Sequence, residues 1–289
     1  MEDVTFIILT KNEEVNLPDC LESIKGFAKR IVVIDSGSTD KTCDIAGEAG
    51  ASVYVRPFEN YARQFNWGID NTGIDTLWTF RLDADERLTP GLCKELSGIM
   101  REHAEDDVNG VIMEAWLWFM GKRIKHGCHN KRKMMLFKTG IGRIEDRNMD
   151  EHTVLSEGRS VVCRERFIHC DLKDMTHWIN KMNRYAAREM QDYFEFVSGE
   201  NSHAISAENG RGISGQRRKK FGIYYRFPMF FRCWLLFVYY YIFRLGFLDG
   251  KEGFVYHWMY HRWYRTLVDA KILEQKISGK PFEKTGELK

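Results

Sequence analysis

The sequence predicts an α/β fold in which helices flank a mostly parallel β-sheet. Short apolar, β-branched runs alternate four times with helix-like segments in the N-terminal third of the chain. The connections between these segments are short, and acidic residues directly follow several of the apolar runs. Ligands of such sheets bind at the carboxyl ends of the strands, so the acidic residues mark the place to look for a site.

The first strands and helices follow from local pattern. Compact apolar runs predict buried strands at residues 4–9, 31–34, 51–55 and 78–82. Helices are expected between them at residues 16–24, 41–50 and 61–72. Further along, a Pro at a helix start predicts a helix at 89–103. Strands are then expected at 111–119 and 131–138, and apolar residues at helical spacing predict a helix at 174–197.

The most informative stretch is WTFRLDADER, which begins at Trp78. An alternating apolar strand breaks there into Asp83, Asp85 and Glu86. Carboxylates avoid interiors unless they are paired or bind a cation, and oxygen ligands suit Mg²⁺ or Mn²⁺. Asp83 and Asp85 are therefore candidate metal ligands, and a solvated acidic turn is the alternative.

Two other strand ends carry polar residues of the same kind. Asn12 and Glu13 follow the first strand, and Asp35 with Asp40 follows the second. Acids on a solvated surface would be scattered along helices, whereas these would meet at one edge of a parallel sheet. The pattern favours a binding site over a solvated face.

These motifs together resemble family 2 glycosyltransferases, which have the GT-A nucleotide-sugar-binding fold. The similarity rests on TKNE from Thr10, DSGSTDKT from Asp35, Arg63 and Asn66 in the third helix, and LDADE. It covers roughly the first 170 residues. The resemblance implies a donor site that includes Thr10, Asn12, Glu13, Asp35 and Asp83, with Asp83 and Asp85 as the metal-binding acids. Arg63 is a further donor-site candidate, for phosphate or base, or else a solvated helix residue.

The resemblance also implies an inverting transfer, which needs a carboxylate base near the acceptor hydroxyl. The candidates are Glu151 first, then Asp150, then Asp146. His169 is either a third metal ligand, a diphosphate contact or a buried, hydrogen-bonded histidine. His126, Cys128 and His129 lack the spacing of a structural zinc site.

Composition narrows the class of protein. The chain has 289 residues, of which 44% are hydrophobic and 29% charged, so a sizeable core is expected and overall disorder is excluded. A net charge of +2 gives no support for a nucleic-acid-binding protein. Seven scattered cysteines suit a reducing cytoplasm, and the acidic start MEDVTFIILTKNEE does not read as a signal peptide.

The C-terminal part differs in composition. We expect a catalytic domain at 1–197, a linker at 198–216 and a basic, aromatic helical appendage at 217–289. Its uncharged run of about eleven residues is too short for a bilayer span of roughly twenty. Aromatics with Arg226, Arg232 and Arg244 at intervals favour a segment in a membrane interface, with arginines at lipid phosphates. The alternative is a helix buried against the catalytic domain or a second subunit, and His257 and His261 are expected at the surface.

The sequence thus predicts an inverting, Mg²⁺- or Mn²⁺-dependent glycosyltransferase at the cytoplasmic face of a bacterial inner membrane. Its donor would be a nucleotide sugar, most simply a UDP-sugar. Further likeness in KRKMMLFK and GFLDGKEG to lipopolysaccharide-core and capsular polysaccharide enzymes implies a lipid-linked or lipopolysaccharide acceptor. The alternatives are a nucleotidyltransferase, although TKNEE is not a Gly-rich phosphate loop, and a non-catalytic membrane scaffold.

Overall fold

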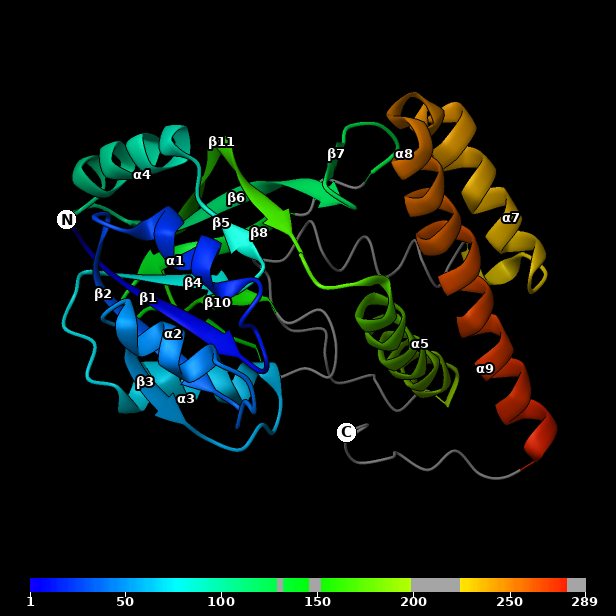
Figure 1. The fold of residues 1–289 in the computed structure, drawn as a ribbon, viewed down its shortest axis with the longest axis horizontal. Helices are drawn as coiled ribbons and strands as arrows, with labels where there is room; N and C mark the ends of the chain where they lie inside the picture. The colour runs from blue at the N-terminus through cyan, green and yellow to red at the C-terminus, as the bar shows by residue number, and fades with distance from the viewer. Residues whose placement is uncertain (129–131, 146–151, 199–223, 280–289) are drawn as a thin grey trace. The chain divides into compact units, whose positions relative to one another are not determined.

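The computed structural model describes residues 1–128, 132–145, 152–198 and 224–279 (Figure 1). The chain divides into two compact units. The first comprises Met1–Arg123 and His129–Lys173, and the second comprises Ile124–Cys128 and Asp174–Lys289. The predicted linker at 198–216 lies outside the described residues except for Ser198, as does the end of the chain from residue 280.

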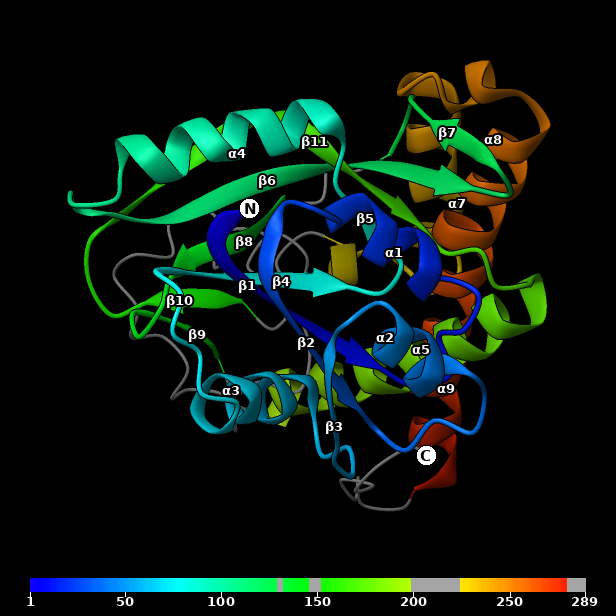
Figure 2. The ribbon, with the colours of Figure 1, turned by 60° about the vertical axis from the view of Figure 1, so that its left-hand side comes forward.

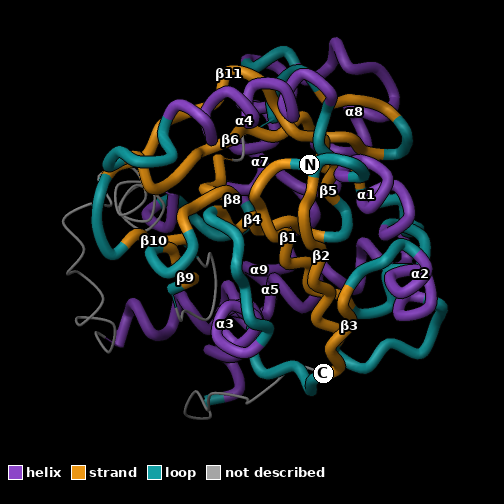
Figure 3. Tube along the Cα trace, turned by 90° about the vertical axis from the view of Figure 1, so that its left-hand side faces the viewer, coloured by secondary structure: helices purple, strands orange, loops and turns teal. Residues whose placement is uncertain are grey.

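The first unit is built on one mixed sheet whose described strands follow the order β3-β2-β1-β4-β8-β6-β11-β5, with β7 beside β6. Figure 3 shows the succession from β3 through β2, β1, β4 and β8 to β6. The strands β3, β2, β1 and β4 are mutually parallel, while β8 runs antiparallel to both β4 and β6. β11 is parallel to β6, and β9 and β10 form a separate antiparallel pair. The bounds of the strands are β1 Glu2–Thr10, β2 Ala28–Asp35, β3 Ser52–Val55, β4 Trp78–Asp83, β5 Glu86–Arg87, β6 Val108–Phe119, β7 Lys122–Ile124, β8 Arg132–Lys138, β9 Gly142–Ile144, β10 Thr153–Leu155 and β11 Arg159–Cys170.

Helices cover both faces of this sheet, as Figure 2 shows for α4 and α3. Successive side chains of a strand point to opposite faces. Phe6 and Ile8 therefore pack in the core with α1 and α4, whereas Ile7 packs in the core with α3. The bounds of the helices are α1 Leu17–Ile24, α2 Thr42–Glu48, α3 Tyr61–Asn71 and α4 Pro90–Glu102.

The predicted α/β fold is confirmed, and each strand and helix expected up to residue 138 is present within a few residues of its expected ends. Local signals explain the helix starts. The side chain of Asn60 accepts a hydrogen bond from Arg63 N at the start of α3, and Thr89 accepts one from Leu92 N before Pro90 of α4. The parallel part of the sheet is its N-terminal half, and the reversed direction of β8 makes the whole sheet mixed.

The second unit is helical. Its helix α5, Met175–Ser198, packs against α9, Tyr264–Ser278, around Met182, Ala186, Val268 and Ile272 (Figure 1). The helix predicted at 174–197 therefore shares a core with the C-terminal helices. For this reason the division between the compact units falls at Lys173, earlier than the predicted domain boundary at 197.

Apart from the 3-10 turn Tyr224–Arg226, the other helices described in this unit form two runs joined by a tight turn. The first run is α7, Phe231–Val238, which continues as the π-helical turn Tyr239–Phe243. The second begins with the 3-10 turn Gly246–Asp249 and continues through α8, Gly250–His257, the π-helical turn Trp258–Trp263 and α9. In the described part of the chain no single helix is long and apolar enough to span a membrane. The two runs, bent by 69°, satisfy the length and composition together.

Three polar side chains of this unit are not where the sequence placed them. Arg232 is buried and its Nε lies 3.0 Å from Oδ1 of Asp269, so it faces an internal carboxylate and not lipid phosphates. His257 and His261, expected at the surface, are both buried. Tyr240 stacks on His261 at 4.1 Å, and Gly127 approaches His257 so closely that a Cβ at Gly127 would lie 2.7 Å from its ring. Residues from other segments of the chain cover both rings, and the spacing of residues along one helix does not predict such contacts.

Candidate donor and metal site

The carboxyl ends of β1, β2 and β4 bring the predicted residues to one edge of the sheet. Thr10 pairs with Asp35 across β1 and β2, and Leu9 pairs with Asp83 across β1 and β4. Parallel strands in this register end side by side, which places three polar strand ends within one neighbourhood. The spatial convergence expected from the sequence is thus present.

Asp35 organises the loop that follows β2. It is fully buried, and its carboxylate accepts hydrogen bonds from Thr10 Oγ1 at 2.8 Å, Gly37 N at 2.8 Å and Ser38 N at 2.6 Å. Burial opposes ionisation, but the hydrogen bonds from Ser38, Thr10 and Gly37 outweigh it and lower the pKa of Asp35. The carboxylate is therefore a fixed, ionised acceptor at the strand end.

Asn12 and Glu13 link the end of β1 to neighbouring segments. Asn12 adopts a left-handed backbone with φ of 55°, and its Oδ1 accepts a hydrogen bond from Thr39 N at 2.8 Å. Oε1 of Glu13 lies 2.6 Å from Nζ of Lys173, which follows β11. Burial raises the pKa of Glu13, while the hydrogen bonds from Lys173 and Asn16 act against that rise. Both predicted donor residues thus belong to the strand-end network.

Asp83 pairs with a lysine and with a tyrosine hydroxyl. Its Oδ2 lies 2.7 Å from Nζ of Lys133, and its Oδ1 accepts a hydrogen bond from the Tyr61 hydroxyl at 2.7 Å. Arg81 in turn donates to the same hydroxyl at 2.8 Å. Burial opposes ionisation of Asp83, but Lys133 and Arg81 outweigh it and hold its pKa well below the usual range.

Glu86 is a site residue that the sequence analysis did not single out. It is buried at the start of β5, where Oε1 lies 2.5 Å from Lys133 Nζ and Oε2 accepts a hydrogen bond from Asp83 N at 3.1 Å. Burial raises the pKa of Glu86 to about 7; Lys133 opposes this rise, while Asp83 and Asp85 add to it. One lysine ammonium thus pairs with two carboxylates, Asp83 and Glu86.

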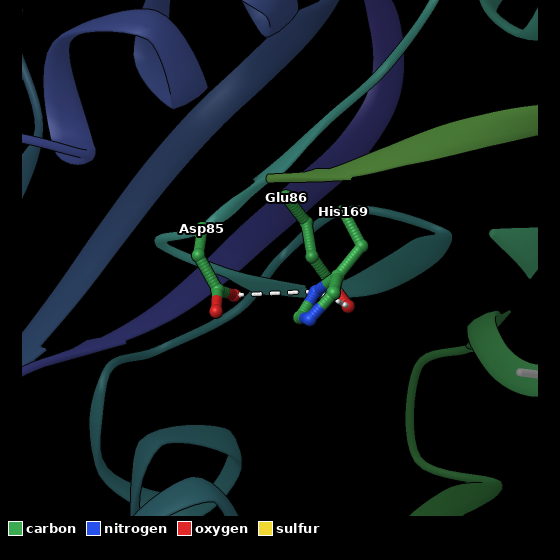
Figure 4. A group of neighbouring side chains, drawn as sticks. All are labelled: Asp85, Glu86 and His169. Atoms are coloured by element: carbon green, nitrogen blue, oxygen red, sulfur yellow. Dashed lines mark ion pairs between the residues drawn. The ribbon is translucent and has the colours of Figure 1, made fainter. Parts of the chain in front are cut away.

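Asp85, Glu86 and His169 form a group that could hold a metal ion (Figure 4). One ligand atom from each lies within 4.8 Å of the others. Nδ1 of His169, near the end of β11, is 3.7 Å from Oδ1 of Asp85 and 3.8 Å from Oε1 of Glu86. Ligands at about 2.1 Å from one ion lie roughly 3 to 4 Å apart, so the spacing fits a small divalent cation.

The two predicted metal ligands, Asp83 and Asp85, have different partners in the structure. Asp85 belongs to the metal-competent group, whereas Asp83 is held by Lys133 and Tyr61. His169, for which three roles were open, lies beside Asp85 and Glu86. Glu86 could have been suspected from its place in the same acidic run, and Lys133 from its charge at the start of an apolar strand.

Two polar residues of α3, Arg63 and Asn66, have partners outside the helix. Arg63 is more than half exposed and pairs with Glu59 of the preceding turn at 3.2 Å. Asn66 donates to Ile144 O at 2.8 Å and accepts from Ile144 N at 3.0 Å, which ties α3 to β9. The candidate bases Asp146, Asp150 and Glu151 lie outside the described residues.

Comparison with known proteins agrees with this geometry. Residues 5–151, which are 147 of the 289 residues, match the family described as Glycosyl transferase family 2. The chain therefore belongs to glycosyltransferase family 2.

The relatives cover different parts of the chain. An uncharacterized glycosyltransferase of Rickettsia felis is 35% identical over 106 residues, which are 37% of each protein. This chain thus spans little more than a third of that relative. The lipopolysaccharide core biosynthesis glycosyltransferase LpsC of Rhizobium meliloti is 28% identical over 202 residues, covering 65% of this chain and 70% of LpsC.

Among solved structures, glucosyl-3-phosphoglycerate synthase of Mycobacterium tuberculosis, in complex with Mn²⁺ and UDP, is similar over 40% of this chain and 44% of that chain. The sequence identity is 18% and the TM-score is 0.31.

Proposed function

We propose that this protein is an inverting, metal-dependent glycosyltransferase that moves a sugar from a nucleoside diphosphate sugar, a UDP-sugar in the simplest case, to a lipid-linked or lipopolysaccharide-core saccharide. The observation that carries the proposal is the group Asp85, Glu86 and His169 beside Asp83, at the strand ends of a family 2 domain. Membership of the family supports the reaction class.

The chemistry requires stabilisation of a leaving diphosphate. A divalent cation bound by Asp85, Glu86 and His169 would supply a Lewis acid for the charge that develops there. The imidazole in this ligand set favours Mn²⁺ over Mg²⁺, which prefers oxygen ligands.

The protein's own residues would position the donor. Asp83, held ionised by Lys133, would accept a hydrogen bond from a ribose hydroxyl. Asp35, Thr10, Asn12 and Glu13 would shape the nucleoside pocket around the ends of β1 and β2.

The acceptor hydroxyl must lose a proton as it attacks the sugar. We propose Glu151 as the base, with Asp150 as the second candidate. Comparison of Glu151→Gln with Asp150→Asn tests this assignment. Loss of a general base lowers the transfer rate by about a hundredfold or more. If neither variant slows transfer to that extent, both assignments are wrong.

The acceptor and location follow from the relatives and from composition. LpsC acts in lipopolysaccharide core biosynthesis by its name, which supports an acceptor of that class. The aromatic, basic C-terminal part supports attachment to the cytoplasmic face of a bacterial inner membrane. The proposed acceptor and the proposed membrane location are both compatible with a homo-oligomer.

A thermal-shift experiment tests the donor site directly. The full-length protein is heated with UDP-, GDP- and dTDP-sugars, with and without Mn²⁺. A ligand at a hundred times its dissociation constant stabilises the folded state by about 2.7 kcal/mol. We expect a shift with UDP-sugars that requires Mn²⁺ and disappears in Asp85→Asn. A shift that is independent of metal would contradict the proposed site.

A further inference from the structure

The second unit carries an unusual amount of exposed apolar surface. Of the 26 large hydrophobic side chains that are exposed among the described residues, 13 lie between residues 227 and 258. Isolated exposed hydrophobic residues are normal, whereas a concentration of this kind marks an interaction surface. These side chains lie on α7 and α8, on the turns that join them, and on residues just before α7 and just after α8.

The centre of this face is the turn between the two helical runs, residues 243–248, here called the apolar tip. Phe243 is 72% exposed and Leu248 is 56% exposed, and Leu245 and Phe247 are exposed as well. Turns in contact with water are usually built from Gly, Asn, Asp, Ser and Pro. Apart from Gly246 and one arginine, this turn presents bulky apolar side chains.

Two bulky residues of this face, one of them in the tip, have strained backbone conformations. Leu245 has a left-handed conformation with φ of 61°, and Phe230, before α7, has φ of 63°. Each such bulky residue costs about 1 kcal/mol or more, a strain that glycine would relieve. Strained positions that keep a large side chain tend to be functional.

Hydrogen bonds and close packing within the second unit also hold the backbone of the tip in place. Asp249, which follows it, is buried and accepts hydrogen bonds from Lys125 N at 2.9 Å and His126 N at 2.8 Å. Gly246 fits against the ring of His257, where a Cβ would lie 2.4 Å from Nε2. The exposed side chains are therefore held outward on a fixed turn.

The fully exposed charges around the tip are positive, and Glu252 beside Lys251 is partly exposed. Between residues 226 and 251 the acid is Asp249, which is buried, and the buried Arg232 is paired with Asp269. The exposed charges in this range are Arg226, Arg244 and Lys251. An apolar surface ringed by cations complements a bilayer whose headgroups are anionic phosphates. A second copy of this face would instead bring like charges together.

We propose that the apolar tip inserts into the headgroup–acyl boundary of an anionic lipid bilayer, with Arg244 and Lys251 at the lipid phosphates. This inference rests on the membrane attachment proposed above and adds which residues enter the bilayer. The two helical runs that meet at the tip are bent by 69° relative to each other. A depth of about 5 to 10 Å is expected of an interfacial element of this kind.

Vesicle flotation of the full-length protein tests the proposal. The vesicles contain phosphatidylcholine alone or with phosphatidylglycerol, and the test variant is Phe243→Ser with Leu248→Ser, which changes no charge. The matched control is Ile277→Ser, which alters a side chain 76% exposed on α9 outside the face. We expect the double variant to bind anionic vesicles at least about tenfold more weakly, because two apolar side chains no longer enter the bilayer. The control should bind as the wild type does.

Further readouts separate the possible outcomes. Unchanged thermal unfolding of the double variant shows that weaker binding does not come from misfolding. If the wild type and the double variant float equally well, the tip does not insert and the proposal is overturned. Attachment to the vesicles would then depend on basic residues alone. A wild type that forms dimers disrupted by the double substitution, without binding vesicles, makes the face a protein interface and overturns the proposal. Mn²⁺-dependent donor binding, measured without vesicles, should be the same in all variants, so failure of the donor site is seen separately.

Discussion

Lys133 of β8 lies 2.7 Å from Oδ2 of Asp83 and also contacts Glu86, so one ammonium is shared by carboxylates at the ends of two different elements. The lysine comes from a strand that is antiparallel to β4, which carries Asp83. Its charge stabilises acids that burial would otherwise drive towards protonation. The candidate donor site is therefore built around an internal cation as well as around its acids.

Removal of this lysine should unfold the site. Lys133→Met leaves two carboxylates without their buried partner, and breaking such a pair costs about 3 kcal/mol or more. Lys29→Met is the control, because the Lys29–Asp3 pair is half exposed and screened by water, so its loss should destabilise the protein much less. Urea unfolding of the three proteins measures the difference. Equal losses in both variants would show that Lys133 is not a buried partner.

The stability of the metal-free protein should fall as pH rises towards neutrality. With its pKa raised to about 7, Glu86 keeps a proton in the folded state that the unfolded chain loses above about 4.5. Between these values the folded state holds more protons, so this group lowers the free energy of unfolding by up to about 1.4 kcal/mol per pH unit.

The Glu86→Gln variant isolates this effect. Unfolding of wild type and variant is compared between about pH 5 and 7 in EDTA. The wild type should lose stability relative to the variant as pH rises, and Mn²⁺ should reduce the loss, because a cation favours the ionised carboxylate. Parallel curves for the two proteins would contradict the raised pKa.

Metal affinity should depend on Asp85 and His169. Substitution of residues that merely orient ligands lowers affinity by about 10- to 100-fold, so loss of a ligand should do at least as much. We expect Asp85→Asn and His169→Gln to weaken Mn²⁺ binding at least about tenfold in calorimetry. Asp70→Asn is the control, because Asp70 pairs with Arg143 at the surface. An Asp83→Asn variant that binds Mn²⁺ normally would assign that residue to the donor alone.

The second unit should depend on its internal ion pair. Asp269 is buried and accepts hydrogen bonds from Arg232 Nε and, at 2.8 Å, from Phe230 N. Arg232→Met should lower the unfolding free energy of this unit by about 3 to 5 kcal/mol, since it leaves a buried carboxylate unpaired. Arg143→Met, which removes a half-exposed pair with Asp70, should cost less than about 1 kcal/mol. A small effect of Arg232→Met would imply that water reaches Asp269.

The residue pattern alone predicted the alternation of strands and helices and the gathering of Thr10, Asp35 and Asp83 at one sheet edge. These features follow from periodicity and from the geometry of parallel strands, which are local properties or general rules. The helix starts at Asn60 and Thr89 also follow from the local sequence, because a capping side chain bonds to backbone groups within one turn.

Which side chains contact one another in the site and in the second unit could be learned from the folded structure and not from local pattern. Lys133 and His169 reach the acids from strands far along the chain, and Asp269 meets Arg232 from another helix. The burial of His257 and His261 depends on Tyr240 and on the segment Ile124–Cys128, which lies far from them in sequence. Contacts of this kind depend on packing between distant segments, and the spacing of residues along one helix or strand carries no information about them.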